Sequence, residues 1–200
     1  MLIYGAGGHG RVVWTAVMAA GGNVLAFFDD DPSRNEWNSV PIVGPYDATV
    51  HSDEPVVLAI GDGAIRQRLS TEIDHGFGTV VHPSALIDES CRVEQGSMVL
   101  HGAILQIGTN IGKHSIVNSG ASIDHDCAVG DFAHIAPGVT ICGEVSIGCG
   151  TLVGAGAVIL PGISIGANVV IGAGAVVNRD VPDAAIVVGN PGVQIDRSVG

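Results

Sequence analysis

The chain has 200 residues, of which 46% are hydrophobic and only 4% aromatic, and its formal net charge is −12. This size allows one or two domains, and the composition favours a narrow core of Val, Ile and Ala over a core filled by bulky rings. The negative charge argues against nucleic acid or an anionic membrane as a partner, because both require a basic surface. Phosphate-bearing ligands remain possible, since backbone amides and helix N-termini hold them without net positive charge.

Strand and helix patterns alternate in the first 80 residues. The predicted elements, in chain order, are a strand at 2–4, a helix at 11–20, strands at 23–28 and 55–60, a helix at 64–75 and a strand at 79–81. Such alternation predicts a small Rossmann-like parallel α/β sheet with right-handed crossovers. The segment 32–55 is rich in proline and polar residues, and its pattern places no element there.

A glycine-rich turn follows the first predicted strand. The spacing Gly5-x-Gly7-x-x-Gly10, after a strand and before a helix, matches a dinucleotide-binding fingerprint. Bare backbone there lets amides approach a diphosphate, and Asp29 or Asp30 could then accept hydrogen bonds from a ribose or base. The alternative is a tight turn without a ligand. Among ligands, a nucleotide attached to another group is favoured over NAD, because eighty residues hold only half of a full dinucleotide fold.

From Val81 to Val177 an aliphatic residue returns every six positions without interruption. A small or β-branched residue follows four places after each of them, as Ala103 follows Val99. Neither helical spacing nor two-residue alternation produces this register, whereas a six-residue period is typical of a parallel β-helix built of triangular coils. Both residues then point inward, and stacked coils bury a core that no single coil buries alone. Glycine often follows the aliphatic residue, as at Gly112, where we expect a tight corner.

The four cysteines do not form a disulfide pattern. Cys91 and Cys127 fall in one inward column two coils apart, which at about 4.8 Å per strand layer gives about 9.6 Å and exceeds disulfide reach. Free thiols are typical of an intracellular protein. The N-terminus lacks the basic region of a signal peptide, and no uncharged apolar run is long enough to span a bilayer. We therefore expect a soluble, cytoplasmic protein.

Polar residues at the corners of the coils are the candidates for chemistry. Four histidines lie in the repeat: His101, His114, His125 and His134. No two share a column, so we expect no metal site within one chain, although a symmetric assembly could build one on its axis. His125 is flanked by Asp124 and Asp126. A carboxylate bonded to one ring nitrogen fixes the tautomer and makes the other nitrogen a better base. A solvated corner histidine is the alternative.

The chain resembles the sugar acyltransferases of the PglD/NeuD group over essentially its whole length. The motifs that carry the resemblance are Gly-Ala-Gly-Gly-His-Gly near the start, Phe28-Asp29-Asp30, Ala59-Ile60-Gly61, Val81-His82-Pro83 and the unbroken hexapeptide repeat. The resemblance implies a Rossmann-like nucleotide-sugar-binding domain over 1–80 and a left-handed parallel β-helix acyltransferase domain with a C-terminal tail over 81–200. It also implies an acetyl-CoA-dependent enzyme that forms a homotrimer. The nearest branch of the group acetylates the 4-amino group of a UDP-linked amino-dideoxy sugar in the bacillosamine pathway.

By the same resemblance, the catalytic pair falls on His125 and Asp126, with His125 as the general base and Asp126 orienting it. The free amine then attacks the thioester directly. The Gly143 N–H, one coil above His125, is a candidate to polarise the thioester carbonyl. A second histidine, which contacts acetyl-CoA, falls on His134, and an asparagine of the site falls on Asn118.

The resemblance also implies where the two substrates lie. Acetyl-CoA occupies a groove between neighbouring prisms, against outward small residues such as Ala155 and Ala173. The residues implied for the nucleotide sugar are Gly7, Gly8 and His9 at its diphosphate, Asp29 and Asp30 at its base and ribose, and Gly61. No metal is implied.

One departure concerns the C-terminus. Members of the group often have Gly-x-Pro-Ala followed by Lys or Arg, whereas this chain has Gly189-Asn190-Pro191-Gly192-Val193. Arg179 or Arg197 is then the candidate to meet the coenzyme phosphates.

Alternative functions stay open at this point. The acceptor could be a hydroxyl, as in sialic acid O-acetylation, or the amine of GDP-perosamine, and the residues do not separate these cases. A non-enzymatic nucleotide-binding module on a trimeric β-helical stalk is the third alternative.

Overall fold

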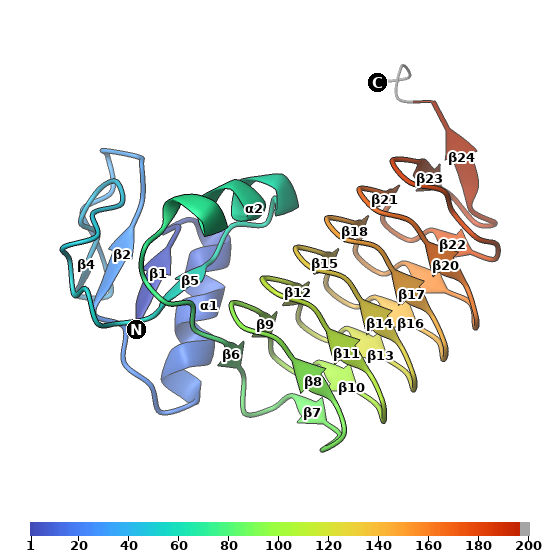
Figure 1. Ribbon diagram of the computed structural model, residues 1–200, viewed down its shortest axis with the longest axis horizontal. Helices are drawn as coiled ribbons and strands as arrows, with labels where there is room; N and C mark the ends of the chain where they lie inside the picture. Colours follow the sequence, from blue (N-terminus) through green and yellow to red (C-terminus); the bar gives the residue numbers. More distant parts are fainter. Residues whose placement is uncertain (197–200) are drawn as a thin grey trace.

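The computed structural model describes residues 1–196 and consists of a small α/β region followed by a prism of stacked coils (Figure 1). The α/β region has a parallel sheet in the order β2-β1-β5, formed by β1 (Leu2–Tyr4), β2 (Ala26–Phe28) and β5 (Val56–Leu58). Helix α1 (Gly8–Ala19) contacts β1 and the first coil, and α2 (Gly63–Glu72) contacts β5. The predicted Rossmann-like sheet is confirmed, with strands shorter than their apolar runs.

The segment that the sequence left unassigned contains a short hairpin. Strands β3 (Glu36–Trp37) and β4 (Val40–Pro41) pair antiparallel around Asn38 and Ser39, whose φ angles are 51° and 65°. Two consecutive residues with positive φ are the signature of a type I′ hairpin turn, in which asparagine is favoured. Strands of two residues are too short to show an alternating pattern, so only the turn could have indicated this hairpin.

The repeat forms the expected left-handed parallel β-helix. Its strands are β6 (Val80–Val81), β7 (Leu86–Ile87), β8 (Arg92–Val93), β9 (Met98–Val99), β10 (Ile104–Leu105), β11 (Asn110–Ile111), β12 (Ile116–Val117), β13 (Ser122–Ile123), β14 (Ala128–Val129), β15 (His134–Ile135), β16 (Thr140–Ile141), β17 (Ser146–Ile147), β18 (Leu152–Val153), β19 (Val158–Ile159), β20 (Ser164–Ile165), β21 (Val170–Ile171), β22 (Val176–Val177), β23 (Ile186–Val188) and β24 (Val193–Ile195). Every third strand joins the same sheet, so the prism has three faces, which we name the β6, β7 and β8 faces after their first strands. Each corner is named by the two faces that it joins.

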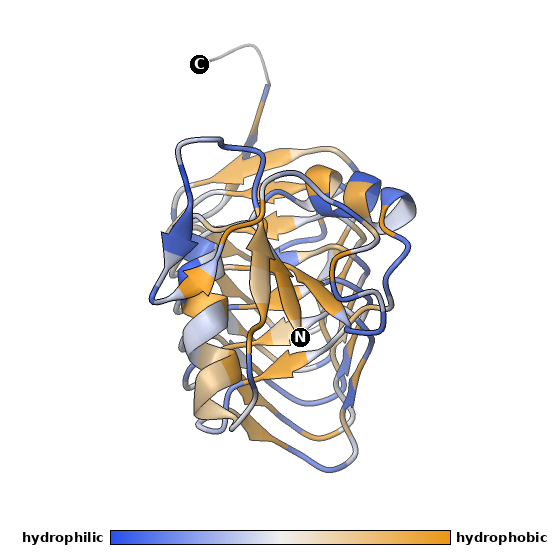
Figure 2. Ribbon diagram, turned by 90° about the vertical axis from the view of Figure 1, so that its left-hand side faces the viewer, coloured by the Kyte–Doolittle hydropathy of each residue, from blue (hydrophilic) through white to orange (hydrophobic). Residues whose placement is uncertain are grey.

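The core of the prism follows the six-residue period. Val99, Val117 and Ile135 pair in register eighteen residues apart, and all three are completely buried. The small residues four places later, such as Ala103 and Ala121, are buried with them. A column of aliphatic residues beside a column of small ones fills the prism without aromatic rings. Most strands are therefore apolar, and the hydrophilic residues concentrate in the connecting segments (Figure 2).

The expected reason for the glycines after the aliphatic residues is wrong. Gly112 and Gly130 do not have positive φ; a Cβ at Gly130 would instead lie 2.7 Å from the amide nitrogen of Cys149 in the next coil. The left-handed backbone occurs two positions further on, at residues such as Gly102 (φ 65°) and Asp126 (φ 56°). Glycine directly after the aliphatic residue thus allows close stacking of coils. The left-handed turn lies three residues after the aliphatic residue.

The last coil departs from the period. Val181 bridges to Ile165, sixteen residues earlier instead of eighteen, so the corner after β22 is two residues shorter than those below it. Strand β23 then pairs parallel with β21, and β24 returns antiparallel to it. The hairpin of β23 and β24 therefore ends the prism on the β6 face.

The α/β region packs on the lower part of the β6 face. Met98 and Ile116 point outward from this face, are completely buried, and share a hydrophobic cluster with Val13 of α1 and Phe27 of β2. The expected division into domains at residues 80 and 81 stays a prediction; it falls within β6, whose strand pairs with β9 of the coils. None of the helices in residues 1–196 is long and apolar enough to cross a membrane.

Candidate active site

His125 lies at the β7/β8 corner, in the turn between β13 and β14, and its side chain is 47% exposed. Its Nδ1 lies 3.0 Å from Oδ2 of Asp126. Asp126 occupies the left-handed position of the turn, and its carboxylate bonds the ring of the residue before it. The ring therefore faces solvent, its Nδ1 is held by a carboxylate, and its Nε2 is left for other partners.

Acidic neighbours raise the pKa of His125. The hydrogen bond that the ring donates to Asp126 contributes most, and the charges of Asp124, Asp126 and Glu144 add to it. Glu144 belongs to the next coil, where its N–H donates to the His125 carbonyl at 2.9 Å. Sequence reasoning missed Glu144. Its position eighteen residues after Asp126 was the available signal.

Gly143 makes room for the His125 ring. A Cβ at Gly143 would lie 2.5 Å from Nε2 of His125, so the ring rests against the bare backbone of the coil above. Within residues 1–196 the Gly143 N–H donates no hydrogen bond, while its carbonyl accepts one from Gly162. This corner therefore combines a free ring nitrogen with a free backbone donor, which suits proton transfer beside a developing oxyanion.

A second group of the expected site residues lies on the β6 face. Nδ1 of His134 lies 3.1 Å from the Gly61 carbonyl, and Nε2 lies 3.1 Å from Nδ2 of Asn118. A carbonyl only accepts, so Nδ1 carries the proton and Nε2 accepts from the Asn118 amide. Burial lowers the pKa of His134, and it lowers that of His9, whose ring centroid is 6.2 Å away, to about 4. Both rings are therefore neutral at pH 7.

Arg66 of α2, which the sequence did not single out, holds the Gly61 segment on the prism. Its guanidinium is completely buried, and all five of its N–H groups donate to backbone carbonyls. The acceptors are the carbonyls of Ile60, Gly61, His114, Phe132 and Ala133, at 2.6 to 3.0 Å. They come from the loop after β5 and from two successive turns of the β8/β6 corner, so one side chain ties three segments together.

The two carboxylates expected at the base and ribose have partners within the chain. Asp29 is buried and accepts from the N–H of Ala6 at 2.7 Å and from Nη1 of Arg34 at 2.7 Å. Asp30 is exposed and accepts from the Tyr4 hydroxyl at 3.1 Å. Burial and this bond raise the pKa of Tyr4 to about 12. Asp29 thus anchors the glycine-rich turn, and the ligand roles of both carboxylates stay predictions.

One chain does not bring the two groups together. His125, Asp126 and Gly143 lie at the β7/β8 corner, which is opposite the β6 face in a triangular prism. The remaining expected residues lie on the β6 face, at its β6/β7 corner or in the α/β region: Gly7, Gly8, His9, Asp29, Asp30, Gly61, Asn118, His134, Ala155 and Ala173. A site that uses both groups therefore requires a second copy of the chain.

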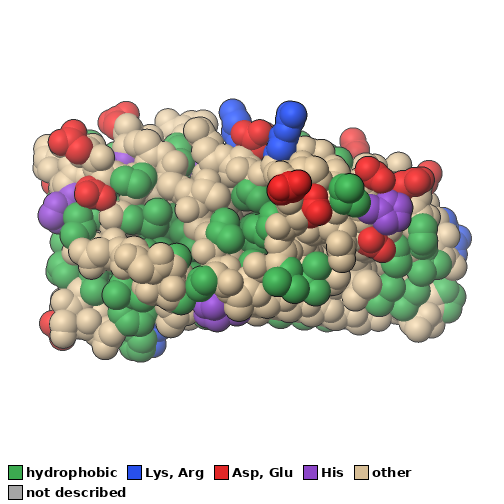
Figure 3. Space-filling model, turned by 90° about the horizontal axis from the view of Figure 1, so that it is seen from below, with side chains coloured by type: hydrophobic (Ala, Val, Ile, Leu, Met, Phe, Trp, Pro, Cys, Tyr) green, Lys and Arg blue, Asp and Glu red, His purple; other side chains and the backbone are tan. Residues whose placement is uncertain are grey.

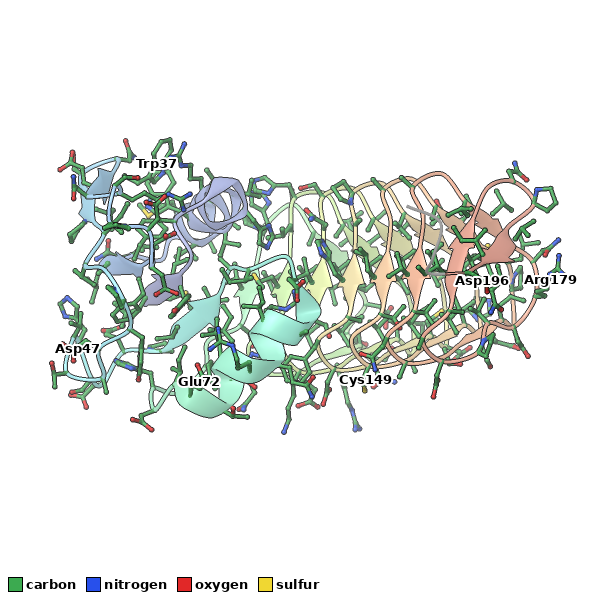
Figure 4. All side chains as sticks on the ribbon, turned by 90° about the horizontal axis from the view of Figure 1, so that it is seen from above. Trp37, Asp47, Glu72, Cys149, Arg179 and Asp196 are labelled. Carbon is green, nitrogen blue, oxygen red and sulfur yellow. The ribbon has the colours of Figure 1, made fainter. Side chains whose placement is uncertain are left out.

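The structure describes one of the two candidates for the coenzyme phosphates. Arg179 is exposed at the β7/β8 corner, three coils above His125 and at the far end of the molecule from the α/β region (Figure 4). Arg197 lies outside the described residues. The part of the chain that the structure describes contains no group of three or more His, Cys, Asp or Glu able to hold a metal ion.

Comparison with known proteins finds matches over both regions. Residues 1–73 match the family model of the PglD N-terminal domain, and residues 144–179 match that of the bacterial transferase hexapeptide, six repeats. A curated relative, UDP-N-acetylbacillosamine N-acetyltransferase of Bacillus subtilis (strain 168), is 35% identical over 111 residues. That match covers 49% of this chain and 50% of the relative, so this chain spans about half the length of the curated protein it matches.

Two solved structures match over nearly the whole chain. Perosamine N-acetyltransferase from Caulobacter crescentus, a histidine variant in complex with CoA and GDP-perosamine, is 37% identical, with a TM-score of 0.93 over 98% of this chain and 96% of its own. The acetyltransferase domain of PglB from Neisseria gonorrhoeae FA1090 is 32% identical, with a TM-score of 0.90 over 97% of this chain and 98% of its own. The latter has also been solved in complex with acetyl coenzyme A.

Proposed function

Because this chain belongs to the PglD-like family of hexapeptide-repeat sugar acyltransferases, we propose that it transfers the acetyl group of acetyl-CoA to the amino group of a nucleotide-linked amino sugar. The observation that carries the proposal is the match, over 98% of the chain, to an enzyme whose structure contains CoA and GDP-perosamine. The curated relative is also an N-acetyltransferase by name. These two names favour an amine acceptor over the hydroxyl acceptor of sialic acid O-acetylation.

The geometry at the β7/β8 corner supports a direct transfer. The amine nitrogen bonds to the acetyl carbonyl carbon, and the carbon–sulfur bond of the thioester breaks. His125 takes the proton that the amine loses and returns it to the departing thiolate. Asp126 holds Nδ1 at 3.0 Å, which leaves Nε2 for this proton. The Gly143 N–H is the donor for the carbonyl oxygen while it carries negative charge.

We assign the completion of the site to an assembly, a homotrimer in which each site lies between two chains. The α/β region of one chain holds the nucleotide sugar against its own Gly61, Asn118 and His134. A neighbouring chain brings its His125 corner to this group. The separation of the two groups on opposite sides of one prism supports this arrangement, and symmetric assemblies repeat such a heterologous contact until the ring closes.

Acetyl-CoA then lies along the groove between two prisms, where Ala155 and Ala173 leave room for it. We assign its phosphates to Arg179, three coils and about 14 Å from His125. Acidic side chains outnumber basic ones on the face seen in Figure 3, so an anionic coenzyme finds few cations. Arg179→Ala should raise the KM for acetyl-CoA but not for acetyl-pantetheine, which lacks the nucleotide phosphates. An equal change in the KM for both substrates would show that Arg179 does not bind the coenzyme phosphates.

For the sugar itself we propose a UDP-4-amino-4,6-dideoxy sugar, which the name of the bacillosamine relative supports. GDP-perosamine is the second candidate, which the Caulobacter complex supports. A thiol-release assay with acetyl-CoA and a panel of UDP-, GDP- and CMP-linked sugars separates them. We expect thiol release with an amino sugar and none with its hydroxyl analogue. Thiol release with the hydroxyl analogues alone would show that the enzyme is an O-acetyltransferase.

A further inference from the structure

The turn after β1 contains four glycines, and the fold requires glycine at only two of these positions. Gly5 has a φ of 101°, and a Cβ at Gly10 would lie 1.8 Å from the Gly5 carbonyl oxygen, so the fold requires both. A Cβ at Gly8 would meet nothing within 4 Å, and one at Gly7 would meet only Nη1 of Arg34, at an ordinary 3.5 Å. The fold therefore does not require glycine at Gly7 or Gly8, and the space above them is open to a ligand.

The backbone donors at this turn are free. Helix α2 has its first turn capped by Asp62, which accepts from the N–H of Ile65 at 3.0 Å. Helix α1 begins after Gly7 without a side-chain cap and has no acidic residue in its first turn. Its leading N–H groups, those of Gly8 and His9, donate no hydrogen bond within residues 1–196. These groups suit an anion.

Arg34 lies beside this open space. Its Nη1 donates to Asp29 at 2.7 Å, its Nε lies 3.2 Å from Asp31, and its side chain is 37% exposed. A guanidinium has five N–H donors in a fixed fork, so the side chain keeps donors that no group in residues 1–196 uses. The partly exposed fork next to Gly7 matches the geometry of a phosphate, which it can meet with two parallel bonds.

Arg34 also reduces the electrostatic repulsion that a diphosphate would meet at this turn. The buried Asp29 carboxylate lies directly beneath the turn, because it accepts from the N–H of Ala6. A negative charge there would repel a diphosphate, and the guanidinium of Arg34, which also pairs with Asp31, offsets part of it. The hairpin that follows Arg34 is fixed near the start of α1, since the Arg11 guanidinium lies 4.0 Å from the centroid of the Trp37 ring.

We propose that Arg34 binds the diphosphate of the nucleotide sugar, together with the free amides of Gly8 and His9. The inference rests on the proposed function and names a binding residue for the nucleotide half of that site. Asp29 then acts on the ligand through Arg34: it holds the guanidinium over Gly7. The base and the sugar of the ligand bind elsewhere and do not depend on Arg34.

The test is calorimetric titration of the full-length protein with UDP and GDP, and with uridine and guanosine as probes without phosphate. Arg34→Met should weaken binding of the preferred diphosphate by roughly tenfold to a hundredfold, as loss of charge-assisted hydrogen bonds does. Arg34→Lys should restore part of the affinity, because it keeps the charge but not the fork. Nucleoside binding should change little. Arg68→Met is the matched control, since Arg68 is exposed on α2 and, among the residues that the structure describes, forms an ion pair only with Glu72.

A second variant guards against an effect of Arg34 on folding. Gly8→Ala places a methyl group in the open space without a clash, so its thermal melt should match that of the wild type while diphosphate affinity falls. Unchanged UDP and GDP affinity in both Arg34→Met and Gly8→Ala overturns the inference and leaves the proposed function in place. A wild-type protein that acetylates amino sugars yet binds neither UDP nor GDP also overturns it. Failure of the proposed function is separate, and it appears as an absence of thiol release in the wild type.

Discussion

Two histidines of the site differ in what their ring nitrogens contact. His125 is half exposed, has one nitrogen on Asp126 and keeps the other free. His134 is largely buried and has both nitrogens occupied, by Gly61 and Asn118. A free nitrogen on an exposed ring suits proton transfer, whereas a neutral ring bonded at both ends suits positioning. These contacts agree with the roles that the resemblance implies, a general base at His125 and a contact of acetyl-CoA at His134, and both roles stay predictions.

The raised pKa of His125 predicts the pH dependence of the reaction. A base works only when it is unprotonated, so kcat/KM should rise with pH through a midpoint above the ordinary value for histidine. Asp126 makes the largest contribution to the raised pKa, and Asp126→Asn should therefore move this midpoint down. The measurement is kcat/KM from pH 5 to 9, at constant ionic strength, for both proteins. A midpoint that does not move would show that Asp126 does not tune the base.

His125→Ala tests the base itself. We expect kcat to fall by about 10²-fold or more, the usual contribution of a general base. The melting temperature should be preserved because the side chain is exposed at a corner. His101→Ala, at another corner, is the matched control for loss of an imidazole. Retention of most of the wild-type rate in His125→Ala would contradict the assignment.

At the scale of secondary structure, the coils could be predicted from the sequence because each hexad repeats the same local requirement. Val99, Val117 and Ile135 meet one environment, so the period alone identifies it. The hairpin at 36–41 could not be predicted from a strand pattern, because its strands have two residues each, and only its turn at Asn38 offered a signal. Arg66 was missed for a different reason: its partners are backbone carbonyls that folding brings together, and no local spacing indicates a contact of that kind. Arg34 was missed although its partners Asp29 and Asp31 lie only five and three residues before it.

The contacts of Arg66 predict that its side chain contributes to the stability of the fold. Replacing Arg66 with methionine removes a donor from five carbonyls. Those of Gly61 and Ala133 also accept from other groups of the chain, so three carbonyls lose the only donor that residues 1–196 give them. Unsatisfied buried groups cost about 1–3 kcal/mol each. We expect the free energy of unfolding to fall by about 3 kcal/mol or more, since water can reach only some of these groups. Denaturant unfolding followed by circular dichroism measures the change. Arg68→Met, on the exposed side of the same helix, should change the free energy of unfolding by no more than about 0.5 kcal/mol.

At the scale of the whole molecule, the prism sets where the two halves of the site lie. The α/β region covers the lower β6 face, with α1 against β6 and Arg66 on the β8/β6 corner. The β7/β8 corner is left uncovered and carries His125. The central claim is therefore that the base of one chain acts on the nucleotide sugar held by another. The period of the sequence predicted the prism, but this separation follows only from where the α/β region docks.

Complementation between two inactive chains tests that claim most directly. One chain carries His125→Ala. The other carries Gly8→Asp, which fits the open space at the turn but repels a diphosphate. Each variant alone should form assemblies with little activity. When the two are unfolded together in equal amounts and refolded, thiol release should return, because about one site in four then combines an intact turn with an intact base from its neighbour. Mixed assemblies that form but stay inactive would contradict the account, since each chain would then depend on its own histidine.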